Sequence, residues 1–88
     1  MNIGEKIVAI RSAEKLNQLQ FSNLTGINTK TLQNYEQGIV KKYNAEEIQK
    51  ITQHELFQKY TLWLMNGMTA PEAGQVSPEV EEVRGLRA

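Results

Sequence analysis

Residues 16–38, with the sequence LNQLQFSNLTGINTKTLQNYEQG, constrain the fold more than any other part of this 88-residue chain. They predict two short helices joined by a tight turn. Asn17 suits the N-cap of a first helix over residues 18–24, because its side chain can accept hydrogen bonds from free main-chain amides. Gly26 suits the end of that helix, because the residue just past a helix often adopts a positive φ.

The second helix is expected over residues 29–37, with Asn28 as its N-cap and Gly38 at its end. Leu32 and Tyr35 would bury one face of this helix. The residues left on its outer face are mostly short or medium polar groups: Thr29, Lys30, Thr31, Gln33 and Asn34. Such donors and acceptors can read base edges in a major groove. The polarity by itself is explained equally well by an exposed helix that binds no partner.

Several residues of this stretch share a pattern with a known family. They are Leu16-Asn17-Gln18, Phe21, Leu24, Gly26, Ile27, Asn28, Leu32 and Tyr35-Glu36-Gln37-Gly38. The pattern resembles the helix-turn-helix of the lambda and 434 phage repressors, the Cro proteins and the larger XRE-type family of bacterial regulators, and it covers residues 3–67. Two departures are Ser22 in place of the usual alanine, and Leu19-Gln20 in place of a commonly acidic pair.

The resemblance implies roles for individual residues. Arg11 is expected to form a structural ion pair with Glu36 of the Y-E-x-G motif. The residues expected to face base edges are Thr29, Lys30, Gln33 and Asn34. The residues expected to contact the DNA backbone are Asn17, Gln18, Thr31, Gln37, Lys41 and Lys42.

The flanking segments predict three more helices, which complete a domain over residues 1–67. A first helix spans residues 3–15, a fourth follows Asn44 to residue 52, and a fifth spans residues 54–66. The fifth carries more apolar residues than one buried stripe needs, which indicates a partner surface. By resemblance this surface is a homodimer contact, with Leu56, Trp63 and Met65 as its candidates. Filling of the monomer core is the alternative explanation.

Residues 68–88 have the small residues and proline of a flexible tail. A short helix over residues 78–84 is possible, because serine precedes proline at its start. So few residues do not hold a helix in water unless Val80 and Val83 dock on something. A tail that stays mostly disordered is favoured over a docked helix.

Composition argues against catalysis. The chain has no cysteine and one histidine, His54, so we expect no metal site, no cofactor and no enzymatic activity. No apolar run approaches the length of a membrane span, and no signal-peptide pattern occurs at the N-terminus. A cytoplasmic protein, associated with the nucleoid of a bacterial or phage-infected cell, is therefore expected. The net charge of zero does not exclude a small local basic patch.

Together these observations predict an all-α, five-helix lambda-repressor-like domain with a flexible C-terminal tail. The expected function is sequence-specific binding of double-stranded DNA by a Cro-type repressor, acting as a homodimer on a palindromic operator. The alternative is an antitoxin-like regulator or protein-interaction module that binds a partner protein through Val80, Val83 and Leu86.

Overall fold

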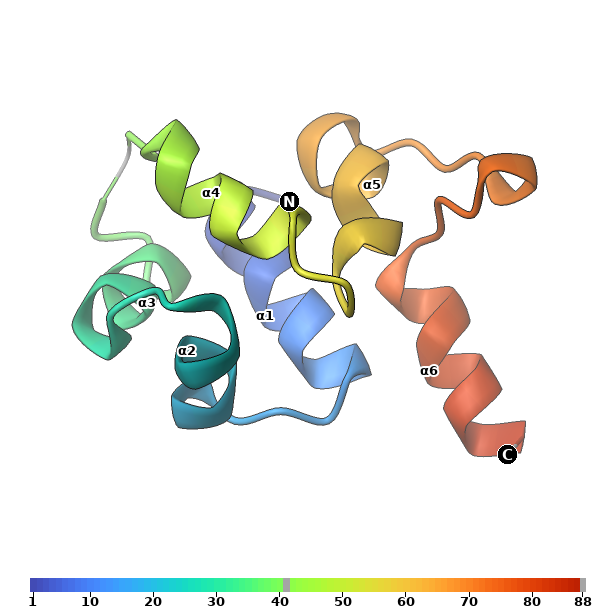
Figure 1. Ribbon diagram of the computed structural model, residues 1–88, viewed down its shortest axis with the longest axis horizontal. Helices are drawn as coiled ribbons and strands as arrows, with labels where there is room; N and C mark the ends of the chain where they lie inside the picture. The colour runs from blue at the N-terminus through green and yellow to red at the C-terminus, as the bar shows by residue number, and fades with distance from the viewer. Residues whose placement is uncertain (41, 88) are drawn as a thin grey trace.

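Helices make up every regular element in the part of the chain that the computed structural model describes (Figure 1). That part comprises residues 1–40 and 42–87, without the side chains of Leu86 and Arg87. The elements are α1 (Ile3–Ala13), α2 (Gln18–Thr25), α3 (Thr29–Glu36), α4 (Ala45–Thr52), the 3₁₀ helix η1 (Gln58–Tyr60), α5 (Thr61–Asn66), the 3₁₀ helix η2 (Pro71–Ala73) and α6 (Pro78–Arg87). The all-α fold class is confirmed. None of these helices is long and apolar enough to cross a bilayer.

Helix α1 is central to the packing. It lies between the α2–α3 side of the molecule and α6, and it contacts α3, α5 and α6 (Figure 1). Asn2 begins the helix with a capping box, in which its side chain accepts from the amide of Glu5 and the Glu5 carboxylate accepts from the amide of Asn2. Ile7 and Ile10 are fully buried. The helices around α1 therefore share one core.

Gly4 allows α1 to approach α3 closely. A Cβ atom at this position would overlap the main-chain carbonyl oxygen of Tyr35, near the C-terminal end of α3. Only a residue without a side chain leaves the two backbones this near each other. The sequence patterns did not single out this glycine.

The fifth helix was expected to begin at residue 54, and this start is wrong. Helix α5 begins at Thr61. The His54 imidazole nitrogen Nδ1 accepts from the amide of Leu56, and the carbonyl of His54 accepts from the amides of Phe57 and Gln58. These bonds form a turn that competes with a regular helix. Phe57 enters the core from this turn, with its ring centroid 4.9 Å from that of Phe21.

Residues 68–77 are more ordered than the expected flexible tail. Ala70 and Gln75 exchange two main-chain hydrogen bonds, and the Gln75 side chain bonds both to the amide of Leu62 and to the carbonyl of Gln58. Val76 is buried and donates its amide to the carbonyl of Lys59 at 2.8 Å. These contacts anchor the segment on η1 and α5.

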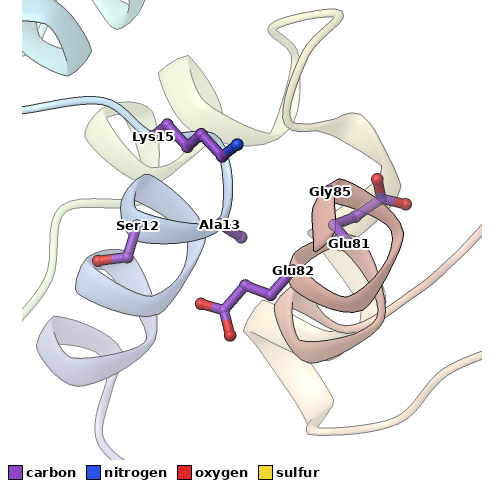
Figure 2. A pocket seen from close by; sticks show the side chains of 6 residues that line it. All are labelled: Ser12, Ala13, Lys15, Glu81, Glu82 and Gly85. Carbon is purple, nitrogen blue, oxygen red and sulfur yellow. The ribbon is translucent and has the colours of Figure 1, made fainter. Parts of the chain in front are cut away.

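Helix α6 then runs from Pro78 to Arg87, three residues beyond the predicted end, and packs on α1. A cavity of about 300 Å³ lies between the two helices, and Figure 2 shows Ala13 and Glu82 directed into this space. A helix this short is unstable alone in water, but packing on α1 stabilises α6. The expectation of a mostly disordered tail is thus corrected.

The valines of α6 do not make this contact. Val80 and Val83 are 40% and 42% exposed, so α6 does not dock on α1 through these two side chains. Instead the Lys59 ammonium lies 3.2 Å from a Glu14 carboxylate oxygen and 3.4 Å from one of Glu81, which links α6 to the end of α1 through ion pairs.

Tyr60 lies beneath this ion-pair cluster. Its side chain is fully buried, and its hydroxyl has no hydrogen-bond partner within the described residues. Burial raises the pKa of Tyr60 well above its usual range, and the negative charges of Glu14 and Glu81 raise it further. The tyrosine therefore stays neutral at physiological pH.

Substitution of Gly4 by alanine tests the close approach of α1 and α3. We expect Gly4→Ala to lower the free energy of unfolding by about 1–3 kcal/mol, because α1 and α3 must move apart. The matched control is Gly85→Ala in α6, where a Cβ meets nothing nearer than 3.9 Å. It should leave stability unchanged or raise it by up to about 1 kcal/mol. Urea denaturation followed by circular dichroism measures both, and equal stability of Gly4→Ala and the parent would contradict the close packing.

Candidate nucleic-acid interface

Local hydrogen bonds define the α2–turn–α3 unit. Asn17 and Gln20 form a capping box at the start of α2, with Asn17 Oδ1 accepting from the Gln20 amide at 2.8 Å. Gly26 ends the helix with φ of 80°, in the left-handed region. Asn28 caps α3 by accepting from the amide of Lys30. These starts and ends agree closely with the sequence pattern.

Ser22 ties the two helices together from inside the unit. It is buried, its hydroxyl donates to the carbonyl of Ile27 in the turn, and it accepts from the Thr29 hydroxyl at 3.1 Å. The resemblance noted in the sequence predicts an alanine at this position, and the serine found there adds hydrogen bonds to the turn. The Thr29 hydroxyl proton is committed to this contact, although its oxygen can still accept.

An ion pair between Arg11 and Glu36 connects α1 to the end of α3, as the resemblance led us to expect. Arg11 Nε and Nη2 donate to the two carboxylate oxygens of Glu36 at 3.1 and 2.9 Å. Arg11 Nη1 donates to the carbonyl of Leu16, and Gln18 Nε2 donates to Glu36 Oε1 at 3.0 Å. We call these four residues the Arg11–Glu36 cluster. It joins α1, the start of α2 and α3 through charge-assisted bonds.

The polar residues of α3 form one outward surface. Leu32 and Tyr35 are buried on the inner face, as predicted. Lys30 and Gln37 are exposed, while Thr29, Thr31, Gln33 and Asn34 are partly exposed. The side chains of this surface differ in length and carry both hydrogen-bond donors and acceptors.

The loop after α3 adds further groups beside this surface. Lys42 is exposed, and Lys41 lies outside the described residues. Ile39 is 64% exposed directly after α3, and its amide donates to the carbonyl of Asn34 at 3.1 Å. The sequence patterns did not single out Ile39 as a candidate site residue.

The three dimer candidates from the sequence have different surroundings. Leu56 is exposed in the turn before η1. Met65 is exposed on α5 and lines a cavity of about 370 Å³ with Ile3 and Tyr43. Trp63 is only partly exposed, packs on the core, and has the Lys6 ammonium 5.4 Å from its ring centroid. Trp63 is therefore already engaged within one molecule.

Comparison with known proteins finds a relative of this chain in a phage. It is 42% identical over 76 residues to "Repressor protein C" of Escherichia phage P2, and the alignment covers 86% of this chain and 76% of the relative. No protein-family model matches the chain. The protein belongs to the family of the phage repressor C proteins.

Removal of one charge tests the Arg11–Glu36 cluster. The Arg11 and Glu36 side chains are only 18% and 5% exposed, so Glu36→Gln would leave a poorly solvated arginine without its counterion. We expect a loss of about 3 kcal/mol in the free energy of unfolding. The control is Glu47→Gln, which breaks the more exposed Lys50–Glu47 pair and should cost less than about 0.5 kcal/mol. Similar losses for the two variants, measured by urea denaturation, would contradict the role of the cluster.

Proposed function

We propose that this protein is a transcriptional repressor of a phage or prophage that binds double-stranded DNA by placing α3 in the major groove. The observation that carries the proposal is the outward polar surface of α3, fixed to α1 by the Arg11–Glu36 cluster. An α-helix fits the major groove, where each base pair presents a distinct pattern of donors and acceptors. The name of the phage P2 relative supports repression as the outcome.

Three side chains on α3 are proposed to read bases directly. Lys30 is exposed and can donate to the O6 and N7 acceptors of guanine. Gln33 and Asn34 each carry an amide that can form the paired bonds preferred by adenine. Thr29 has a smaller role, because its hydroxyl proton already bonds to Ser22.

Other residues around α3 are proposed to hold the DNA backbone: Asn17, Gln18, Thr31, Gln37, Lys41 and Lys42. These contacts would set the position of the helix and carry little sequence information. Gln18 can take part while bonded to Glu36, because its amide oxygen and its second amide hydrogen remain available. The bacterial cytoplasm is the proposed place of action, on the operator DNA.

A homodimer is the proposed binding form, because twofold symmetry lets two copies of α3 read two half-sites of a palindrome. Selection from a random duplex library by purified protein tests this. We expect enrichment of an inverted repeat with half-sites about one helical turn apart. Enrichment of a direct repeat or of a single half-site would reject the palindromic operator, and no enrichment would reject sequence-specific binding.

Two single-lysine substitutions separate base reading from backbone contact. Lys30→Ala should cost about 1–3 kcal/mol on the selected site and relax the preference at one base pair. Lys42→Ala should weaken binding to all duplexes about equally and reduce the slope of log affinity against log salt by about one. Titrations of matched and mismatched duplexes at several salt concentrations measure both. The assigned roles would be contradicted if Lys30→Ala weakened binding to all duplexes equally. They would also be contradicted if Lys42→Ala weakened binding only to certain sequences.

A further inference from the structure

Ile39 is an exposed apolar residue directly after α3. Its side chain is 64% exposed, whereas the next residue, Val40, packs against the core. The core therefore holds the loop through Val40 and leaves the Ile39 side chain in solvent. A single exposed apolar residue needs no explanation by itself. What distinguishes Ile39 is its place beside the outward polar surface of α3.

Main-chain hydrogen bonds hold Ile39 against the end of α3. Gly38 has φ of 72°, and its amide donates to the carbonyl of Tyr35 at 3.1 Å. The amide of Ile39 donates to the carbonyl of Asn34, also at 3.1 Å. These two bonds form a Schellman motif, which ends a helix with a left-handed residue and fixes the residue after it. The position of Ile39 is thus set by the helix end.

The apolar contact that often completes a Schellman motif has no partner on α3. In the motif, the residue after the glycine commonly packs on an apolar side chain at the third or fourth position before the C-cap. The C-cap here is Gln37, so these positions are Asn34 and Gln33, and both are polar. The motif therefore directs Ile39 toward the two amide side chains that are proposed to read adenine.

The major groove offers an apolar group next to such an amide. An A·T pair presents the N6 and N7 groups of adenine, and beside them the C5-methyl group of thymine. An amide that binds adenine would bring an adjacent aliphatic side chain close to a thymine methyl of the same pair or of the next pair. Removing one methyl group from water increases affinity about fourfold.

We infer that Ile39 contacts the C5-methyl group of a thymine in the operator. This thymine lies in a base pair that Asn34 or Gln33 reads, or in the pair next to it. The inference rests on the proposed function and adds an apolar, specificity-determining contact to its polar ones. Unmodified cytosine carries hydrogen at the same carbon, so the contact distinguishes thymine from cytosine.

Replacement of thymine by uracil provides the test, because uracil keeps the base pairing and lacks only the methyl group. One thymine at a time is replaced in one half-site of the selected duplex, and affinities are measured by fluorescence anisotropy. For one position, the parent should bind the uracil duplex about fourfold more weakly than the thymine duplex. Ile39→Ala should bind the thymine duplex about fourfold more weakly than the parent does, and the uracil duplex no more weakly than the thymine duplex.

Met68→Ala is the matched control. Met68 is 60% exposed, like Ile39, but lies between α5 and η2 and outside the helix-turn-helix. This variant should keep the parent's preference for thymine, whatever its overall affinity. Circular dichroism verifies that both variants keep their helix content, which is expected because neither side chain belongs to the core.

Asn34→Ala and Gln33→Ala locate the contact. Each should relax the preference at the base pair that its amide reads, and the thymine that couples to Ile39 should lie at one of these pairs or beside it. A coupled thymine farther away would contradict the placement of Ile39 by the end of α3.

Three results would overturn the inference. The first is a parent that does not distinguish thymine from uracil at any position, and the second is an Ile39→Ala variant that keeps the parent's preference. The third is an equal loss of affinity for both duplexes in Ile39→Ala, which would assign Ile39 a role in holding the loop. In all three, sequence-specific binding by the parent would leave the proposed function intact. A parent that binds no duplex would reject the proposed function and this contact together.

Discussion

The ion pair between Arg11 and Glu36 is the contact on which the position of α3 depends. Both side chains are largely buried, and hydrogen bonds compensate for the loss of water. The arginine also donates to the Leu16 carbonyl, and the carboxylate also accepts from the Gln18 side chain. A buried pair of this kind is costly to break and strict in its geometry. Apolar contacts of Leu32 alone would allow α3 to slide or rotate. The polar cluster removes that freedom, so the outward side chains of α3 are held in one orientation.

Helix α1 carries this constraint to the rest of the molecule. Gly4 lets its backbone meet the end of α3, and two residues later the Lys6 ammonium donates to the carbonyls of Trp63 and Leu64 at 3.1 and 3.2 Å. These carbonyls lie in the last turn of α5, where the helix dipole favours a cation. One helix thus fixes α3 through a glycine and an arginine, and α5 through a lysine. The orientation of the proposed recognition surface is therefore coupled to the C-terminal half.

How far the sequence predicts the structure depends on whether a signal is local. The caps Asn2, Asn17, Asn28 and Asn44 act within three residues, and α1 to α4 begin where they indicate. The ordered tail depends on Gln75 and Lys59, whose partners are distant in the chain, so composition alone predicted flexibility. The outward residues of α3 follow from helical periodicity. Their contact with DNA stays a prediction.

Although the chain has a net charge of zero, its charged side chains are unevenly distributed. Several basic side chains pair with acids inside the protein, as Arg11 does with Glu36 and Lys59 does with Glu14 and Glu81. Lys30, on α3, and Lys42, in the loop between α3 and α4, are exposed. The acidic residues of α6 lie at the other end of the long axis from α3 (Figure 1). At physiological ionic strength charges farther apart than about 8 Å are largely screened from one another. A phosphate backbone at α3 would therefore interact with the nearby lysines and only weakly with α6, and the net charge of the chain says little about its affinity for DNA.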